Sequence, residues 1–377
     1  MNESQAICFP LPHSFTQQEM DAFLIAAFDA KASDITFQPG QPVVAEIHGK
    51  LVPITDRILK DNDVRGVVGL LYGSSAMANL TGGTDLDHRY DIERDRKSRL
   101  GFRVNATPGH IPGGIGCQIT MRTIPGIPPS LVDLNVEQEI CEAINPVQGM
   151  ILVVGVTGSG KSTTLAAAMR DKLENGHDRK IITYEAPIEF IYDKVKSESS
   201  IIWQTEVPTH LRHSDGFAYC VRNALRRKPS DILIGEARDR ETILALIEAS
   251  LTGHTTYSTV HADSVAKTIS RMILKFPEDS RASVAYDLVS VLQLIVAQRL
   301  VPNLAGKRSA LREYFVFTKK AKDQLLELPY EQIPKMLDKM VYANGTSMFH
   351  AAKKAFDAGD IGQDIFRKFT FSSGSTA

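Results

Sequence analysis

A glycine-rich run at Gly155–Thr163 contains the residues most able to do chemistry, in the order Gly-Val-Thr-Gly-Ser-Gly-Lys-Ser-Thr. This order fits a phosphate-binding loop, in which glycines let backbone N–H groups converge on phosphate oxygens. Lys161 can reach the β- and γ-phosphates of a nucleoside triphosphate, and the Ser162 hydroxyl can ligate Mg²⁺. The residues that we predict to contact ATP are Gly155, Thr157, Gly158, Ser159, Gly160, Lys161, Ser162 and Thr163.

The sequence on both sides of this run agrees with that chemistry. The apolar segment Met150–Val154 has the composition of a buried strand, and Ser162–Arg170 has a helical composition. A helix that begins at the loop adds partial positive charge where a phosphate would lie. The alternative is a tight strand-to-helix turn without a ligand. The context favours ATP and Mg²⁺ as cofactors.

Acidic residues follow two other apolar segments and are candidates for holding metal and water. Glu236 ends the run Asp-Ile-Leu-Ile-Gly-Glu, and we assign it to Mg²⁺, directly or through a water. Without the loop, this segment would be an ordinary strand end. Glu185 and Glu189 lie in Ile-Thr-Tyr-Glu-Ala-Pro-Ile-Glu-Phe, after another predicted strand. Carboxylates beside a triphosphate stay ionised only near Mg²⁺ or cationic groups, so a site here requires both.

Two histidines, His254 and His261, bracket the predicted strand Thr255–Val260. A single histidine is usually structural. One that stands at the end of a strand of this sheet could instead donate a hydrogen bond to the γ-phosphate. The residues alone leave both interpretations open.

Helical segments and apolar strands alternate in the second half of the chain, which predicts a mostly parallel sheet covered by helices. The predicted strands are Met150–Val154, Lys180–Tyr184, Asp231–Gly235 and Thr255–Val260. The predicted helices are Lys161–Leu173, Phe217–Arg227 and Arg240–Leu251. Beyond Pro302 we expect helix and then a disordered polar tail, Ser372–Ala377.

The first part of the chain predicts a separate, small α+β domain. Apolar residues recur at helical spacing between Thr16 and Ala30, and short strand-like runs follow. Those runs are Asp34–Phe37, Val43–Ile47, Lys50–Ile54, Phe102–Ala106 and Cys117–Arg122. The charged stretch Asp85–Arg99 is expected to be a solvated loop or a sheet edge. Three prolines in Ile124–Ser130 predict a linker.

Length and composition set further bounds. A length of 377 residues predicts two domains, and a net charge of −1 argues against a protein that coats nucleic acid or anionic membrane. The four cysteines are far apart and form no C-x₂-C pair, which indicates free thiols in a reducing compartment. No apolar run reaches the ~18 residues of a membrane span, and Met1–Ser14 lacks a signal-peptide core. We therefore expect a cytoplasmic protein.

Four segments, in this order, resemble the motifs of the secretion ATPases of the PilT/GspE/VirB11 superfamily. GVTGSGKSTTLAA resembles their Walker A motif, ITYEAPIEF the aspartate box, DILIGEARDRETI the Walker B box, and LTGHTTYSTVHADSV the histidine box. ASDITFQPGQPV and FRVNA with MRTIP resemble the N-terminal PAS-like module. The resemblance covers roughly residues 20 to 320 and implies an α/β fold. The implied parts are a PAS-like N-terminal α+β domain (1–124), a linker (125–145), a RecA-like P-loop core (146–301) and a short helical C-terminal region (302–377).

The resemblance also implies roles for individual residues. Glu189 matches the water-activating glutamate, Glu236 the Walker B glutamate, and His261 the histidine that senses the γ-phosphate. Arg103 and Arg122 match arginines of the N-terminal module that reach toward the phosphates in closed subunits. Guanidinium groups there would neutralise charge on the transferring phosphoryl group. The alternative for both arginines is a charge on a sheet surface.

Departures from the family pattern narrow the resemblance. Ala186 stands where the family commonly has aspartate, so Glu185 must serve the metal alone or be structural. Gly101 replaces a further arginine that the family often has two residues before Arg103. The tetracysteine metal module of type II secretion ATPases is missing, and so is the AIRNLI-like helix of pilus-retraction ATPases. The segments TYEAPIEF, ALRRKP and LREYFVF look most similar to the DotB/TraJ group, the ATPases of type IVB secretion systems and related conjugative plasmids.

This group implies a homohexameric ring, peripherally attached to the inner-membrane channel and coupling components of a secretion system. ATP binding would close the N-terminal domain onto the core, and hydrolysis would release it. One alternative is a pilus-retraction motor. A second is a DNA-translocating RecA-type ATPase, which the single tryptophan and the lack of an aromatic-basic groove disfavour; we expect no direct nucleic-acid binding. The third, a scaffold that binds ATP without turnover, is disfavoured by Glu189 and Glu236.

Overall fold

The computed structural model describes residues 8–10, 15–47, 49–94, 99–124, 126–207, 210–211 and 213–370. The described chain forms two compact units. Unit 1 runs to Ile127 and includes the later segment Glu189–Lys194, and unit 2 comprises Pro128–Ile188 and the chain from Val195 onward. The predicted tail Ser372–Ala377 and most of Met1–Ser14 lie outside the described residues.

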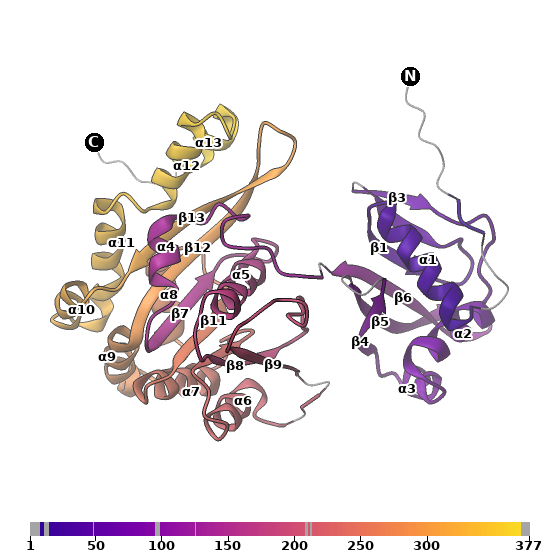
Figure 1. Cartoon of the computed structure of the whole chain (residues 1–377), viewed down its shortest axis with the longest axis horizontal. Coiled ribbons are helices and arrows are strands. Elements are labelled where there is room, and N and C mark those ends of the chain that lie inside the picture. Colours follow the sequence, from indigo (N-terminus) through magenta and orange to yellow (C-terminus); the bar gives the residue numbers. More distant parts are fainter. Residues whose placement is uncertain are drawn as a thin grey trace. The chain divides into compact units, whose positions relative to one another are not determined.

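Unit 1 is an antiparallel sheet with helices packed on it (Figure 1). The strand order is β3-β2-β1-β6-β5-β4. The strands are β1 (Ala32–Phe37), β2 (Val44–Ile47), β3 (Lys50–Pro53), β4 (Leu86–Glu93), β5 (Arg99–Ile111) and β6 (Gly114–Ile124). The helices are α1 (Gln17–Asp29), α2 (Asp61–Tyr72) and α3 (Ala76–Thr81).

The two faces of this sheet differ because successive side chains on a strand point to opposite sides. On β5, Phe102, Val104 and Ala106 are buried in a core shared with the three helices, whereas Arg103 between them is exposed. The charged stretch predicted as a loop or edge is the edge strand β4, whose outer side has no strand partner among the described strands. Charge on an edge strand discourages pairing with another chain.

Unit 2 is built on a sheet with strand order β13-β12-β7-β11-β10-β8-β9 (Figure 1). All its neighbouring pairs are parallel except β12 with β13. Its strands are β7 (Gly149–Val154), β8 (Lys180–Glu185), β9 (Ile201–Glu206), β10 (Asp231–Ile234), β11 (Thr255–Val260), β12 (Leu292–Pro302) and β13 (Arg308–Val316). The four strands predicted from the sequence are confirmed, and they are the buried centre of this sheet.

Helices cover both faces of the sheet. One cluster joins alternate residues of β7 (Met150, Leu152 and Val154) with α6 to α9, while the buried residues of α5 lie outside it. These helices are α5 (Lys161–Glu174), α6 (Gly216–Leu225), α7 (Arg240–Leu251), α8 (Val265–Ile273) and α9 (Arg281–Val291). The remaining helices are α4 (Gln138–Ala143), α10 (Lys319–Leu326), α11 (Ile333–Ala343), α12 (Met348–Asp357) and α13 (Gln363–Thr370).

The expectation of helix directly after Pro302 is wrong. The chain turns at Gly306, which has φ +72°, and returns as β13, antiparallel to β12. An edge strand with one partner tolerates the polar residues of Arg308–Val316, so its sequence lacks a clear strand pattern. The predicted helices begin only with α10. No helix within the described ranges has the length and apolar character needed to cross a bilayer.

Candidate active site

The predicted phosphate-binding loop joins the buried strand β7 to helix α5. Gly158 and Gly160 have φ +76° and +84°, a backbone region that favours glycine. A Cβ atom at Gly155 would lie 2.5 Å from both the backbone oxygen of Gln298 and the Oγ atom of Ser159. Gly155 is therefore required by close packing, and the loop's conformation explains its glycine content.

Lys161 and Ser162 open helix α5 at the end of the loop. The Lys161 side chain is folded back over the loop, where Nζ donates to the carbonyl oxygens of Gly155 (3.0 Å) and Val156 (2.9 Å). Ser162 is exposed at the helix N-terminus, where the helix dipole favours anions. Phosphate oxygens would give the ammonium group stronger, charge-assisted acceptors than these carbonyls.

The sheet brings three further predicted residues to the edge where the loop lies. Strands β7, β11, β10 and β8 are parallel neighbours, so their carboxyl ends meet at one edge. Glu185 ends β8, Glu236 follows β10, and His261 follows β11. Ligand sites of open α/β sheets lie at such carboxyl ends.

Glu236 and His261 face each other at this edge. The His261 Nε2 atom lies 3.5 Å from Glu236 Oε1, and both side chains are partly exposed. The pair adjoins the loop because β11 pairs directly with β7, and the Gly155 amide donates to the Val260 carbonyl at 3.3 Å. A carboxylate and an imidazole are thus available side by side next to a phosphate-binding turn.

His254 lies at the opposite edge. It precedes β11, and its carbonyl accepts a hydrogen bond from the Gly149 amide at the start of β7. A six-residue strand separates the two histidines by ~20 Å. Only His261 of the two bracketing histidines therefore stands at the edge that carries the loop.

Glu185 is held by neighbouring side chains of its own part of the sheet. Its Oε1 atom accepts hydrogen bonds from Thr183 Oγ1 (2.6 Å) and Gln204 Nε2 (3.2 Å). These contacts fix the carboxylate on the β8 and β9 side of the edge. They favour the structural alternative for this residue.

Glu189 belongs to the other unit. It begins the segment Glu189–Lys194, in which the Ile191 amide donates to the Gly126 carbonyl at 3.3 Å and Asp193 pairs with Arg99 at 3.4 Å. No feature of the sequence indicates that this short segment leaves the core. The structure thus divides the two glutamates of the aspartate box between the units.

Arg103 and Arg122 lie directly opposite each other on β5 and β6 of unit 1. Arg103 Nη2 pairs with Asp87 at 3.1 Å, and Arg122 Nε pairs with Asp34 at 2.8 Å. The Arg122 side chain remains 67% exposed despite this ion pair. Both guanidinium groups are thus on the solvated face of the sheet, where exposed ion pairs are weak and can exchange partners.

A cavity of about 1010 Å³ adjoins the loop within unit 2. Gly160, Thr163 and Thr164 line one side of it, and the hairpin of β12 and β13 lines another. Its wall also includes the segment 133–138. The volume suits a nucleotide, because small-molecule sites commonly span ~300–1,000 Å³.

The donor atoms at the edge fit Mg²⁺. Magnesium prefers oxygen ligands and usually keeps several waters, so it needs few protein ligands when phosphates are present. Ser162 offers an exposed hydroxyl and Glu236 a partly exposed carboxylate. Within the described part of the chain, no group of three or more His, Cys, Asp or Glu residues could hold a metal ion. The residues therefore suit a cation that binds together with the phosphates.

Sequence reasoning missed Gln298, which touches the loop from β12. Its Nε2 atom donates to the Ser159 carbonyl at 2.7 Å, and its Oε1 atom accepts from Thr164 Oγ1 at 2.9 Å. A glutamine in an apolar run carries no local signal of such a role, since Ser159 and Thr164 are more than 130 residues away in sequence.

Comparison with known proteins places this site in a family. The family model described as "Type II/IV secretion system protein" matches residues 15–331. The chain belongs to the type II/IV secretion system protein family. It is accordingly a P-loop ATPase of secretion or pilus machinery.

Individual members of the type II/IV secretion family resemble the chain over most of its length. The type IV pilus retraction ATPase PilT of Pseudomonas aeruginosa is 33% identical over 301 residues, which cover 79% of this chain and 83% of PilT. The crystal structure of the Legionella pneumophila ATPase DotB superposes with a TM-score of 0.84 at 40% identity, and covers 97% of this chain and 100% of DotB. PilT with bound ADP gives a TM-score of 0.81 at 26% identity, covering 95% and 97%.

Proposed function

We propose that this ATPase energises substrate transfer or assembly in a type IV secretion system of the type IVB or conjugative kind. The observation that carries the proposal is the single sheet edge on which the loop Gly155–Thr163, His261 and Glu236 meet. The likeness to DotB over nearly the whole chain supports this branch of the family. The chemistry is hydrolysis of ATP to ADP and phosphate.

The loop is assigned to the phosphates of ATP and the neighbouring cavity to the nucleoside. Backbone N–H groups between Gly155 and Thr163 would bind phosphate oxygens, and Lys161 would exchange its loop carbonyls for the β- and γ-phosphates. Thr157, Gly158 and Ser159 belong to the same loop and are likewise assigned to phosphate contacts. ADP bound to the related PilT supports nucleotide binding by this chain.

Ser162 and Glu236 are the residues that would hold Mg²⁺, with Glu185 as a further candidate at the end of β8. When bound with ATP, magnesium neutralises charge on the β- and γ-phosphates. Glu189 is assigned to orient and deprotonate the attacking water. His261, partly exposed beside Glu236, would donate a hydrogen bond to the γ-phosphate.

We assign unit 1 a PAS-like fold and a role in regulating ATP hydrolysis. Arg103 and Arg122 carry exposed guanidinium groups that could leave Asp87 and Asp34 for a phosphate, a stronger acceptor. Arginines on one unit and the phosphate loop on the other would couple nucleotide occupancy to domain motion. Work on a partner would come from that motion.

The assembly is proposed to be a homohexameric ring on the cytoplasmic side of the inner membrane, docked on channel and coupling components. Membership of the type II/IV secretion system protein family supports this arrangement. We assign the core to the RecA-like class. The predicted limits are 1–124 for the N-terminal domain, 125–145 for the linker, 146–301 for the core and 302–377 for the C-terminal region. A cytoplasmic location agrees with the loop's need for cellular ATP.

A pilus-retraction motor is the second candidate, and the 33% identity with PilT favours it. Deleting the gene in its host separates the two. We expect loss of protein or DNA-protein transfer with twitching unchanged, restored by the wild-type gene and not by Glu189→Gln. Loss of twitching with normal transfer would instead establish the retraction motor. ATPase activity stimulated by single-stranded DNA would favour a translocase.

A further inference from the structure

Two buried polar side chains, Gln298 and Arg312, connect the phosphate-binding loop to the segment Leu134–Glu137, which lies in unit 2 shortly after the chain leaves unit 1. Gln298 is 3% exposed and Arg312 is 2% exposed. They lie directly opposite each other on the antiparallel strands β12 and β13. A polar pair this deeply buried must satisfy its hydrogen bonds with protein groups.

Gln298 supports the loop at both of its ends. Its backbone oxygen would be 2.5 Å from a Cβ atom at Gly155, and its Nε2 atom would be 2.8 Å from one at Gly160. The same Nε2 atom donates to the Ser159 carbonyl at 2.7 Å. The glutamine thus touches the first glycine, the serine and the last glycine of the loop, and any change in loop shape must move it.

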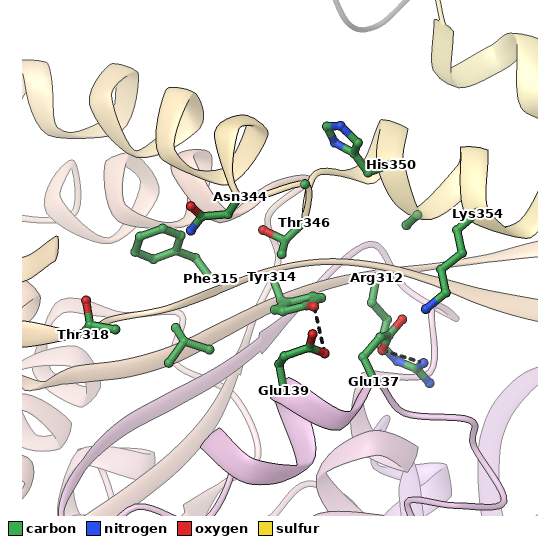
Figure 2. Close-up of a pocket in the computed structure, with 13 residues that line it drawn as sticks. Glu137, Glu139, Arg312, Tyr314, Phe315, Thr318, Asn344, Thr346, His350 and Lys354 are labelled. Carbon is green, nitrogen blue, oxygen red and sulfur yellow. Dashed lines mark hydrogen bonds and ion pairs between the residues drawn. The ribbon is translucent and has the colours of Figure 1, made fainter.

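Arg312 extends this contact to the segment after unit 1. Its Nε atom donates to Gln298 Oε1 at 2.9 Å, while its Nη atoms donate to the carbonyls of Leu134 (2.9 Å) and Asn135 (3.0 Å). Nη1 also lies 3.2 Å from Glu137 Oε2, a contact drawn as a dashed line in Figure 2. One guanidinium group therefore binds the glutamine and three points of the segment Leu134–Glu137.

We propose that Gln298 and Arg312 are positioning residues that hold the segment Leu134–Glu137 in register with the phosphate-binding loop, so that nucleotide in the loop orders this segment. The inference rests on the proposed nucleotide site. Neither side chain needs to touch ATP. Buried hydrogen-bond networks in a low-dielectric interior act as units, because loss of one member leaves the others unsatisfied.

Hydrogen–deuterium exchange of the full chain tests this inference, with and without a non-hydrolysable ATP analogue and Mg²⁺. The amides of Leu134 and Asn135 bond to Ser130 and Val132 carbonyls, so their exchange reports order in the segment. In the wild type we expect saturating analogue to slow exchange by about tenfold, roughly the effect of one hydrogen bond, both in the loop and in peptides covering 130–137.

Two variants break the connection in different places. Gln298→Met keeps the volume but removes the side-chain hydrogen bonds to Ser159 and Thr164. Arg312→Lys keeps the charge but cannot reach all four acceptors. We expect both to keep the loop's response at saturating analogue and to lose that of 130–137. Glu137→Gln, at a partly exposed position, should weaken the response if the buried variants fail to fold.

Tyr314→Phe is the matched control, because it removes a hydrogen bond from the same strand to Glu139, outside the network. This variant should respond as the wild type does. A segment that responds normally in Gln298→Met and Arg312→Lys, or not at all in a wild type whose loop responds, would overturn the inference alone. A wild-type loop with no response to nucleotide would overturn the proposed function, and the inference with it.

Discussion

Individual side chains at the sheet edge are held with different strength by their surroundings. Glu185 accepts two hydrogen bonds through one oxygen, whereas Glu236 has His261 at 3.5 Å, beyond ordinary hydrogen-bond length. A carboxylate with weak protein contacts can take up a metal ion or water without first losing good bonds. Among the glutamates of unit 2's edge, Glu236 therefore suits the metal better than Glu185.

Glu189→Gln tests the assignment of the water-activating residue. Glutamine keeps the size of the side chain but cannot accept the proton from water. We expect kcat for ATP hydrolysis to fall by about 10²–10⁴-fold, with the Kd for ATP unchanged. Steady-state ATPase assays and equilibrium titration measure the two quantities. Glu198→Gln, at an exposed glutamate, is the control, and turnover that survives Glu189→Gln would assign the base elsewhere.

At the scale of whole elements, one buried carboxylate ties two helices to the sheet. Glu313 on β13 accepts hydrogen bonds from the Val265 amide (2.7 Å) and the Met348 amide (3.2 Å), the first residues of α8 and α12. Positive helix ends favour the ionised form of this carboxylate. Burial opposes it more strongly and raises the pKa of Glu313 above its usual 4.5.

This raised pKa predicts how stability depends on pH. Between about pH 4.5 and the raised value, the folded chain binds more protons at Glu313 than the unfolded chain does. The free energy of unfolding of the wild type, measured relative to Glu313→Gln, should therefore fall as pH rises through this window and then level off. Urea unfolding of both proteins between about pH 4 and 8 measures this difference in the free energy of unfolding. A difference that grows with pH would contradict the burial argument.

Elements with strong local signals were predictable, and those defined by distant partners were not. Met150–Val154 and Arg240–Leu251 can be located from apolar pattern alone, because burial in a parallel sheet or under a helix layer dictates such residues. β13 could not be predicted from its sequence, because a strand with a single strand partner can contain polar residues. At the site, the loop, Glu236 and His261 had motif signals. Gln298 had none, since its role depends on contacts across the fold.

At the scale of the whole molecule, the chain crosses between the two units more than once. It leaves unit 1 near Ile127, returns for Glu189–Lys194, and leaves again. The returning segment carries Glu189 and directly follows Ile188 of unit 2. Residues assigned to catalysis therefore belong to both units, which gives a covalent reason to expect that movement of one unit affects chemistry in the other.

Assembly into a ring is the prediction that belongs to this scale. With Mg²⁺ and a non-hydrolysable ATP analogue, light scattering after size exclusion should give a particle of six times the 41.5 kDa chain mass. Nucleotide should favour the ring, because an assembly that binds ATP more tightly is stabilised by mass action. A monomer under all nucleotide conditions would contradict the proposed hexamer while leaving the ATPase assignment intact.

ATP binding to Lys161→Ala tests the central claim most directly. The Nζ atom of Lys161 is assigned to the β- and γ-phosphates, and a charge-assisted hydrogen bond contributes ~1.5–3 kcal/mol. We predict that the wild type binds and hydrolyses Mg²⁺-ATP. The variant should bind about 10- to 150-fold more weakly and show no measurable hydrolysis, whereas Lys353→Ala, at an exposed lysine, behaves as wild type. Wild-type protein without affinity for ATP, or a Lys161→Ala variant that binds and hydrolyses it normally, would contradict the assignment of this site.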